Sequence, residues 1–222
     1  MTRKILLITA FILCVAVLAA MKARMDMLKG DVSRGKADAI IVLAGPPAED
    51  FQRLQEGVRL IEQGAGEYLI LPLRDRAVSW STLKKIYNIE TLISPQQVLL
   101  GRPEQVDSSV QRYCGGTFSE AAMAMELMRA SSLKSAMVVS SRYHIPRVRL
   151  AFGNLNSKGS LDFSYRPVGE PETGKLLSSA YALAKRLTEY GKFFTAFFVY
   201  PIGAKIIEND RCAAGMVKNA RP

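Results

Sequence analysis

The chain has 222 residues, of which 49% are hydrophobic and 23% are charged. This composition excludes an intrinsically disordered chain and is typical of one globular domain with a sizeable core. Lys and Arg number 30 against 20 Asp and Glu, and the net charge of +10 favours anionic partners such as lipid headgroups or phosphorylated glycans. The sequence has neither a basic recognition helix nor the aromatic signature of RNA-binding domains, so we expect no nucleic-acid partner.

The N-terminus contains an uncharged apolar run, Ile5 to Met21, behind a short basic segment. The run is at the lower limit of what crosses a bilayer, and the same pattern is also typical of a cleavable signal peptide. We expect a retained membrane anchor in residues 1–22, because the bulky Met21 and charged Lys22 make a poor cleavage context. Residues 23–36 are polar and basic and are predicted to form a juxtamembrane linker.

Apolar runs and helical periodicities alternate through the rest of the chain. Runs with the composition of buried strands cover residues 39–44, 68–73, 97–100, 135–140 and 162–168. Helices are predicted near 51–64, 80–87, 118–130, 146–155 and 175–199, the last ended by Pro201 and Gly203. The alternation predicts an α/β fold over residues 37–205, with an open, mostly parallel sheet and helices on both faces. Residues 206–222 are predicted to be a flexible tail.

Ligands of such sheets bind beyond the carboxyl ends of the strands, so the residues that follow each strand are candidates for a site. Gly45 follows the first strand, and Arg53 lies on the next helix. The start of this helix and the Arg53 guanidinium can hold an anion, although a plain turn explains the glycine equally well. Thr117 and Glu120 have the spacing of a capping box, which explains them without a ligand.

The segment 140–147 holds Ser140, Ser141, His144 and Arg147 at a strand-to-helix junction. His144 is the only histidine of the chain and is a candidate general acid or base near neutral pH. On the last helix, Glu189 and Lys192 are three residues apart and face the same side. They are either an ordinary surface pair or part of a site.

The three cysteines form neither a disulfide framework nor a metal-binding spacing, so we expect no metal and no cofactor. Cys114 and Cys212 can pair in an oxidising compartment, and the sequence leaves this pairing open.

Together these motifs resemble the YdcF-like family, which includes the SanA and ElyC proteins of the bacterial envelope. The resemblance covers about residues 37–195 and implies a Rossmann-like α/β fold. It rests on 37–43 with Arg53, on Thr117 with Glu120, on 139–147, and on Glu189 with Lys192. The sequence departs from the family pattern after the first two strands, where Ala44-Gly45-Pro46-Pro47 and Pro72-Leu73-Arg74-Asp75 replace glycine-rich segments. These replacements weaken the expectation that backbone amides bind an anion there.

The resemblance implies an envelope-biogenesis protein of the inner membrane with a periplasmic domain, whereas the basic residues after the anchor favour a cytoplasmic domain by the positive-inside rule. The expected substrate is a phosphorylated lipid-linked glycan or carrier, which the protein would hydrolyse or transfer. In this mechanism His144 and Glu120 move protons, while Arg53 and Arg147 hold the phosphate. A non-catalytic envelope scaffold and a binder of a nucleotide-like molecule such as S-adenosylmethionine are the alternatives. The sequence does not determine the oligomeric state.

Overall fold

The computed structural model describes residue 19 and residues 35–72, 78–102, 116–169 and 176–208, with side chains in the last range from 188 to 205. Apart from Ala19, the predicted anchor in residues 5–21 lies outside the described residues, and so do Cys114 and Cys212. Residues 35–208 fall within one compact unit.

A five-stranded parallel sheet forms the centre of the domain, in the order β3-β2-β1-β4-β5. The strands are β1 (Ala39–Val42), β2 (Tyr68–Leu71), β3 (Val98–Leu100), β4 (Ser135–Ser141) and β5 (Asp162–Val168). Their positions confirm the predicted strands, and their pairing confirms the α/β class and the parallel sheet. The chain crosses from edge strand β3 back to β4, which pairs with the central strand β1, so the topological switch point lies between β1 and β4.

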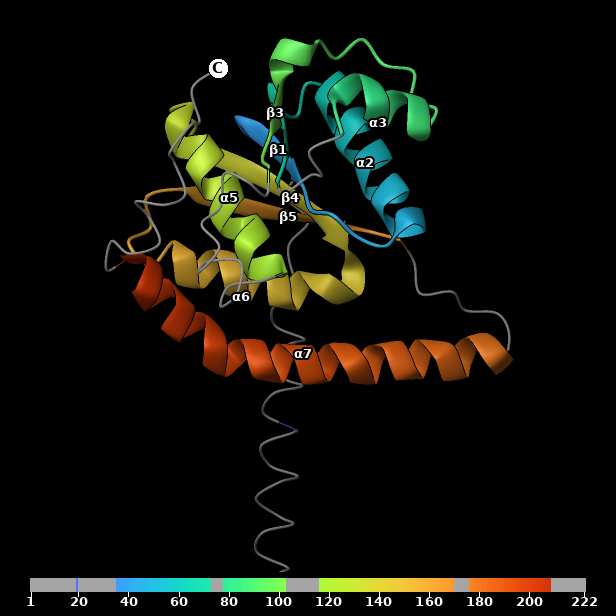
Figure 1. Cartoon of the computed structure of the whole chain (residues 1–222), viewed down its shortest axis with the longest axis vertical. Helices are drawn as coiled ribbons and strands as arrows, with labels where there is room; N and C mark the ends of the chain where they lie inside the picture. The colour runs from blue at the N-terminus through green and yellow to red at the C-terminus, as the bar shows by residue number, and fades with distance from the viewer. Residues whose placement is uncertain (1–18, 20–34, 73–77, 103–115, 170–175, 209–222) are drawn as a thin grey trace, which may run out of the picture. The chain divides into compact units, whose positions relative to one another are not determined.

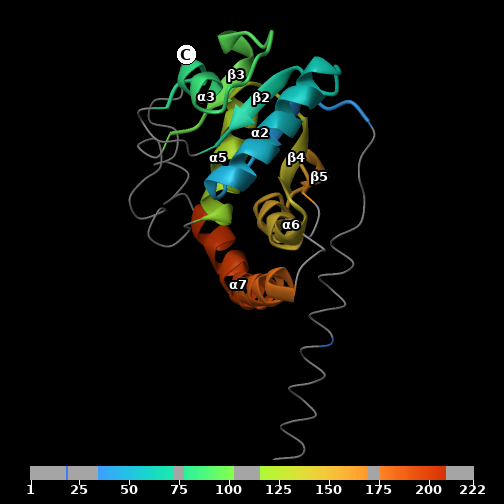
Figure 2. The same cartoon turned by 90° about the vertical axis from the view of Figure 1, so that its right-hand side faces the viewer.

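Helices cover both faces of the sheet (Figures 1 and 2). They are α2 (Pro47–Glu62), α3 (Trp80–Ile86), α5 (Thr117–Ala130), α6 (Ile145–Leu155) and α7 (Leu176–Glu208), with short 3₁₀ turns η1 (Pro95–Gln97) and η3 (Arg142–His144). Helices α2 and α3 lie on one side of the sheet, and α5 and α6 lie on the other. Helix α7 packs along α6, on the side away from the sheet (Figure 1).

The core explains why the first strand is apolar at every position. All residues of β1 are buried, since one face packs on α2 and the other lies under the helices of the opposite layer. Ile40 and Val42 belong to the apolar cluster that includes Leu54 and Val58 of α2. Helix α2 approaches the strand at Gly57, where an added Cβ would lie 2.4 Å from Val42 Cγ2. Only glycine allows this contact without moving the helix.

Two details differ from the sequence prediction. The capping box is absent, because α5 begins at Thr117 and the cap position belongs to Gly116, with φ 69° and no side-chain cap bond. Helix α7 does not end before Pro201 but continues through it to Glu208. Tyr200 and Gly203 on either side of the proline are buried, and their packing outweighs the loss of one helical hydrogen bond. Within the described residues, no helix is both long and apolar enough to cross a membrane.

Candidate functional site

The predicted site residues lie around the carboxyl ends of β1 and β4, next to the switch point. Val42 is paired with Val139, so the turn after β1 and the end of β4 are neighbours. Two groups of polar side chains form at this edge. The first, here called the Arg53 network, consists of Glu49, Arg53, Ser141 and Tyr143. The second, the Glu189 cluster, consists of His144, Arg147, Glu189 and Lys192.

The Arg53 network is built on a guanidinium that is only 1% exposed. Arg53 donates from Nε and Nη2 to Ser141 Oγ, at 3.1 and 2.9 Å, and from Nη2 to Glu49 Oε2 at 3.0 Å. Its Nη1 donates to the carbonyl oxygens of Leu43 and Ala44 at the end of β1. All three guanidinium nitrogens therefore bond to protein acceptors, and Arg53 ties α2 to β1 and β4 instead of facing a cavity.

Glu49 and Gly45 complete this network. Glu49 Oε2 accepts hydrogen bonds from the hydroxyls of Ser141 and Tyr143. An added Cβ at Gly45 would lie 2.8 Å from Arg53 Nη1, so the glycine makes room for the guanidinium. This close approach gives Gly45 a structural role, and the predicted anion-binding role stays a prediction.

Glu120 joins the helix start to the first strand. Its Oε1 accepts a hydrogen bond of 2.7 Å from the backbone N–H of Ala44. The carboxylate therefore contacts the turn after β1 and does not cap its own helix. Thr117 and Ser140 are both buried, at the start of α5 and near the end of β4.

The Glu189 cluster brings together residues from η3, α6 and α7. Glu189 is 5% exposed, and its Oε1 accepts a hydrogen bond of 2.8 Å from Lys192 Nζ. Its Oε2 lies 3.3 Å from Arg147 Nη2 and 3.4 Å from His144 Nδ1. Arg147 Nη2 in turn lies 2.6 Å from His144 Nδ1. Glu189 and Lys192 thus belong to a site with Arg147 and are not an isolated surface pair.

His144 is held in its neutral form. Burial lowers its pKa to about 3, aided by the positive charges of Arg147, Arg53 and Lys192 and opposed by Glu49. The approach of His144 to Glu189 is therefore not an ion pair at neutral pH. Because an arginine can only donate, Nδ1 accepts from Arg147 and the ring proton is assigned to Nε2. An imidazole of this kind does not change charge near neutral pH, unlike the general acid expected from the sequence.

Tyr200 is a further member of this region, and no sequence pattern indicated it. Burial raises the pKa of the Tyr200 hydroxyl, and the negative charges of Glu120 and Glu189 add to this increase. Arg147 opposes it through its positive charge and a hydrogen bond. Its ring packs against Phe118, with centroids 4.8 Å apart. These interactions bring Tyr200 of α7 next to the start of α5 and to Arg147.

A cavity of about 460 Å³ opens beside the Glu189 cluster. Its polar lining includes Arg147, Lys192 and the hydroxyl residues Thr188, Thr195 and Tyr200. Within the described part of the chain, the buried Nε of Arg147 has no hydrogen-bond partner. Of the predicted site residues, only Arg147 and Lys192 line the cavity. Gly45, Arg53, Thr117 and Ser141 are not part of the lining.

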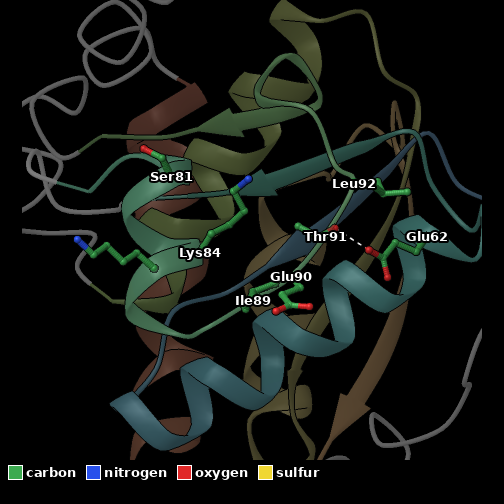
Figure 3. A pocket seen from close by; sticks show the side chains of 8 residues that line it. Glu62, Ser81, Lys84, Ile89, Glu90, Thr91 and Leu92 are labelled. Atoms are coloured by element: carbon green, nitrogen blue, oxygen red, sulfur yellow. Dashed lines mark hydrogen bonds between the residues drawn. The ribbon is translucent and has the colours of Figure 1, made fainter.

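A larger groove of about 740 Å³ lies elsewhere, beside α3 and the end of α2 (Figure 3). Its lysines, Lys84 and Lys85, lie on α3, whereas Glu62 and Glu90 lie on the opposite side of the groove. Thr91 donates a hydrogen bond of 2.6 Å to Glu62. None of the predicted site residues lines this groove. It contains Leu92, which is 97% exposed.

Sequence reasoning missed Glu49, Tyr143 and Tyr200. Glu49 and Arg53 are four residues apart on one helix, a spacing that predicts a salt bridge and was a usable signal. Tyr143 adjoins His144, and their rings stack with centroids 4.6 Å apart. Tyr200 offered no signal, because its position depends on how α7 packs. No group of His, Cys, Asp and Glu among the described residues is arranged to hold a metal ion.

Searches of protein-family models, curated proteins and solved structures find no match to this chain.

Proposed function

We propose that this chain is a membrane-anchored protein of bacterial envelope biogenesis. Its α/β domain binds the phosphate or pyrophosphate of a lipid-linked glycan or carrier and hydrolyses or transfers that group. The membrane anchor is residues 5–21, and the domain lies in the periplasm.

One observation carries the proposal, namely that Arg147 and Lys192 line the same cavity beside the carboxyl edge of the sheet. Both cations contact Glu189, a single buried carboxylate, so the cluster retains one positive charge when His144 is neutral. An anion that enters the cavity meets this positive charge on its lining. Arginine pairs well with phosphate because its parallel N–H groups match two oxygens.

The neutral His144 defines which chemistry the site supports. With its proton on Nε2, the ring can donate a hydrogen bond to a phosphate oxygen but is a weak base. The proposed roles are therefore charge neutralisation by Arg147 and Lys192 and hydrogen bonding by Tyr200, all of which line the cavity. His144 lies outside the lining and acts through its bond to Arg147 Nη2. In hydrolysis, water would add to phosphorus as the bond from phosphorus to the leaving oxygen breaks. Glu120 also lies outside the lining, so it can accept the proton of that water only if the phosphate reaches the turn after β1.

The test uses the full chain in mild detergent and farnesyl pyrophosphate as a soluble lipid-linked probe. We expect binding by calorimetry, with farnesol as the ligand that lacks the anion, and release of inorganic phosphate or pyrophosphate if the site is hydrolytic. Lys192→Gln should weaken binding, whereas Lys158→Gln removes an exposed cation elsewhere and should not. Equal affinity for farnesol, or equal loss in the two variants, would contradict a phosphate site at this cavity.

A non-catalytic scaffold is the second candidate, and the Arg53 network favours it. Every nitrogen of the Arg53 guanidinium bonds to the protein, so this residue strengthens the edge of the sheet where an enzyme would hold substrate. The scaffold predicts that variants of Arg147 and His144 complement an envelope-permeability defect as well as the native chain. Binding of farnesyl pyrophosphate without phosphate release, together with full complementation, would favour it.

A further inference from the structure

Helix α7 has two faces of different character over its described side chains. Glu189, Phe193, Ala196, Tyr200 and Gly203 recur at helical spacing and are buried against the domain. The opposite face carries large apolar side chains that are 38% to 61% exposed, namely Phe194, Phe197, Phe198, Val199 and Ile202. This set is called the α7 apolar face below.

The α7 apolar face is a contiguous surface. Phe198 packs against both Phe194 and Phe197, with ring centroids 5.0 and 5.4 Å apart. Phe194, Phe198 and Ile202 are four residues apart and therefore form one stripe along the helix. The helix lies on the side of the domain away from the sheet, so its outer face is not covered by the sheet or by the helices that pack on it (Figures 1 and 2). Exposed apolar surfaces of this kind mark contact sites with other proteins or with membranes.

The charged residues beside the α7 apolar face indicate what kind of partner covers it. Lys192 and Lys205 flank the apolar stripe, both are exposed, and no acidic residue lies between them in the sequence. A helix with aromatic residues on one side and a lysine at each end of that apolar stripe is compatible with a segment that lies in the interface of an anionic bilayer. The net charge of +10 of the whole chain acts in the same direction.

The cavity supplies an independent argument. Val199 both belongs to the α7 apolar face and lines the cavity that holds Arg147 and Lys192. The apolar face is therefore continuous with a cationic pocket. A phospholipid or lipid-linked phosphate has the same order of parts, since its acyl chain lies in the bilayer and its anionic head lies at the surface.

We infer that the α7 apolar face docks on the surface of an anionic phospholipid bilayer, with Phe194, Phe198 and Ile202 in the acyl region and Lys192 and Lys205 at the headgroups. This contact is separate from the proposed anchor in residues 5–21 and orients the cavity toward the membrane. The inference rests on the membrane location in the proposed function, but not on its chemistry.

The test places a tryptophan on the helix in the full chain. Native Trp80 is the only tryptophan and is buried on α3, so it provides a constant background. Phe198→Trp, or Phe194→Trp if the first variant folds poorly, reports on the α7 apolar face. Leu92→Trp is the matched control, because Leu92 is an exposed apolar residue on the surface beside α3. The chains are reconstituted in vesicles of phosphatidylcholine and phosphatidylglycerol with brominated acyl chains.

We expect bromine quenching and a blue shift at position 198, at a depth of roughly 5–10 Å below the headgroups. Position 92 should give no more quenching than the native chain. Equal quenching at the two positions, or none at 198, would overturn the inference. A blue shift at 198 that needs no lipid and grows with protein concentration would also overturn it, in favour of a second copy of the chain.

The two proposals fail in distinguishable ways. If the native chain does not float with vesicles, both the anchor and the docking are wrong. If it floats but position 198 is not quenched, the anchor stands and the docking is wrong. If position 198 is quenched but farnesyl pyrophosphate does not bind, the docking stands and the proposed phosphate site is wrong.

Discussion

Nη2 of Arg147 donates a hydrogen bond of 2.6 Å to Nδ1 of His144. The same ring nitrogen lies 3.4 Å from Glu189 Oε2, and burial, aided by the charge of Arg147, lowers the pKa of the only histidine so that it stays neutral. The two residues that the sequence places in one loop are thus linked as donor and acceptor. Arg147 carries the positive charge of the pair, and the neutral His144 accepts a hydrogen bond from its guanidinium.

The first prediction concerns pH. The pKa of His144 is about 3 in the folded chain, below its usual 6.5, so the unfolded chain binds the extra proton first as pH falls. The contribution of His144 to stability is therefore complete above pH 6.5 and decreases toward pH 3, by at most about 1.4 kcal/mol per pH unit. Urea unfolding of the full chain in mild detergent at pH 7, 6 and 5 measures this slope.

His144→Gln is the control for this prediction, because it removes the titrating group while other ionisable groups remain. The difference in unfolding free energy between the native chain and the variant should change over this range. A difference that does not depend on pH, or an imidazole that titrates near 6.5 by NMR, would contradict the buried neutral histidine.

A second prediction concerns Gly45. Gly45→Ala places a Cβ 2.8 Å from Arg53 Nη1, in a network that has no free space, so we expect a loss of about 1–3 kcal/mol in unfolding free energy. Gly153→Ala is the matched control, because no atom lies within 4 Å of a Cβ added there and the site is helical. The control should be neutral or stabilising by up to about 1 kcal/mol. Similar effects of the two substitutions would disprove the close contact with Arg53.

A third prediction separates the two arginines of the site. Arg53→Lys should destabilise the fold by about 2–3 kcal/mol, because one ammonium group cannot replace bonds to Ser141, Glu49 and two carbonyls. Arg147→Lys keeps the charge beside Glu189 and should cost less stability than Arg53→Lys, because Arg147 has fewer bonds to lose. Binding of farnesyl pyrophosphate should nevertheless fall in the Arg147 variant. Chemical denaturation measures the stability of both variants, and calorimetry measures their binding of farnesyl pyrophosphate. A larger loss of stability in Arg147→Lys than in Arg53→Lys would refute this prediction.

A fourth prediction tests the role of Glu120. Glu120→Ala removes the acceptor of the Ala44 N–H and should cost about 1–3 kcal/mol, whereas Glu120→Gln keeps a carbonyl oxygen there and should cost less. If Glu120 also moves a proton, the Gln variant should fold normally but release no phosphate from farnesyl pyrophosphate. Full activity in a stable Gln variant would leave Glu120 with a structural role only.

Periodicity predicted the fold closely because the decisive residues are apolar and local. The run at 162–168 became β5, and Pro146 stands in the first turn of α6 as its fixed φ angle favours. The predicted end of the last helix at Pro201 was wrong, because contacts between distant residues decide there and local preference does not. Its local preference ends a helix, but burial of Tyr200 and Gly203 on the domain keeps α7 continuous.

The site was less predictable, because its contacts join residues far apart in sequence. The sequence selected Arg53, Glu120, His144 and Arg147, and the structure gathers them at one edge of the sheet. Their partners could not be inferred from spacing. Arg53 faces Ser141, Glu120 faces Ala44, and Arg147 faces Glu189 only once the sheet and α7 are assembled.

The central position of β1 has a consequence for synthesis of the chain. The ribosome completes β1, β2 and β3 early, but the second edge of β1 is filled by β4, whose Ala136 pairs with Ala39. Until then, a wholly apolar strand has one row of unpaired backbone groups, which is the condition for edge-to-edge aggregation. The nascent domain therefore needs a chaperone or a delay in collapse until β4 has emerged, and the N-terminal half should be insoluble when it is expressed alone.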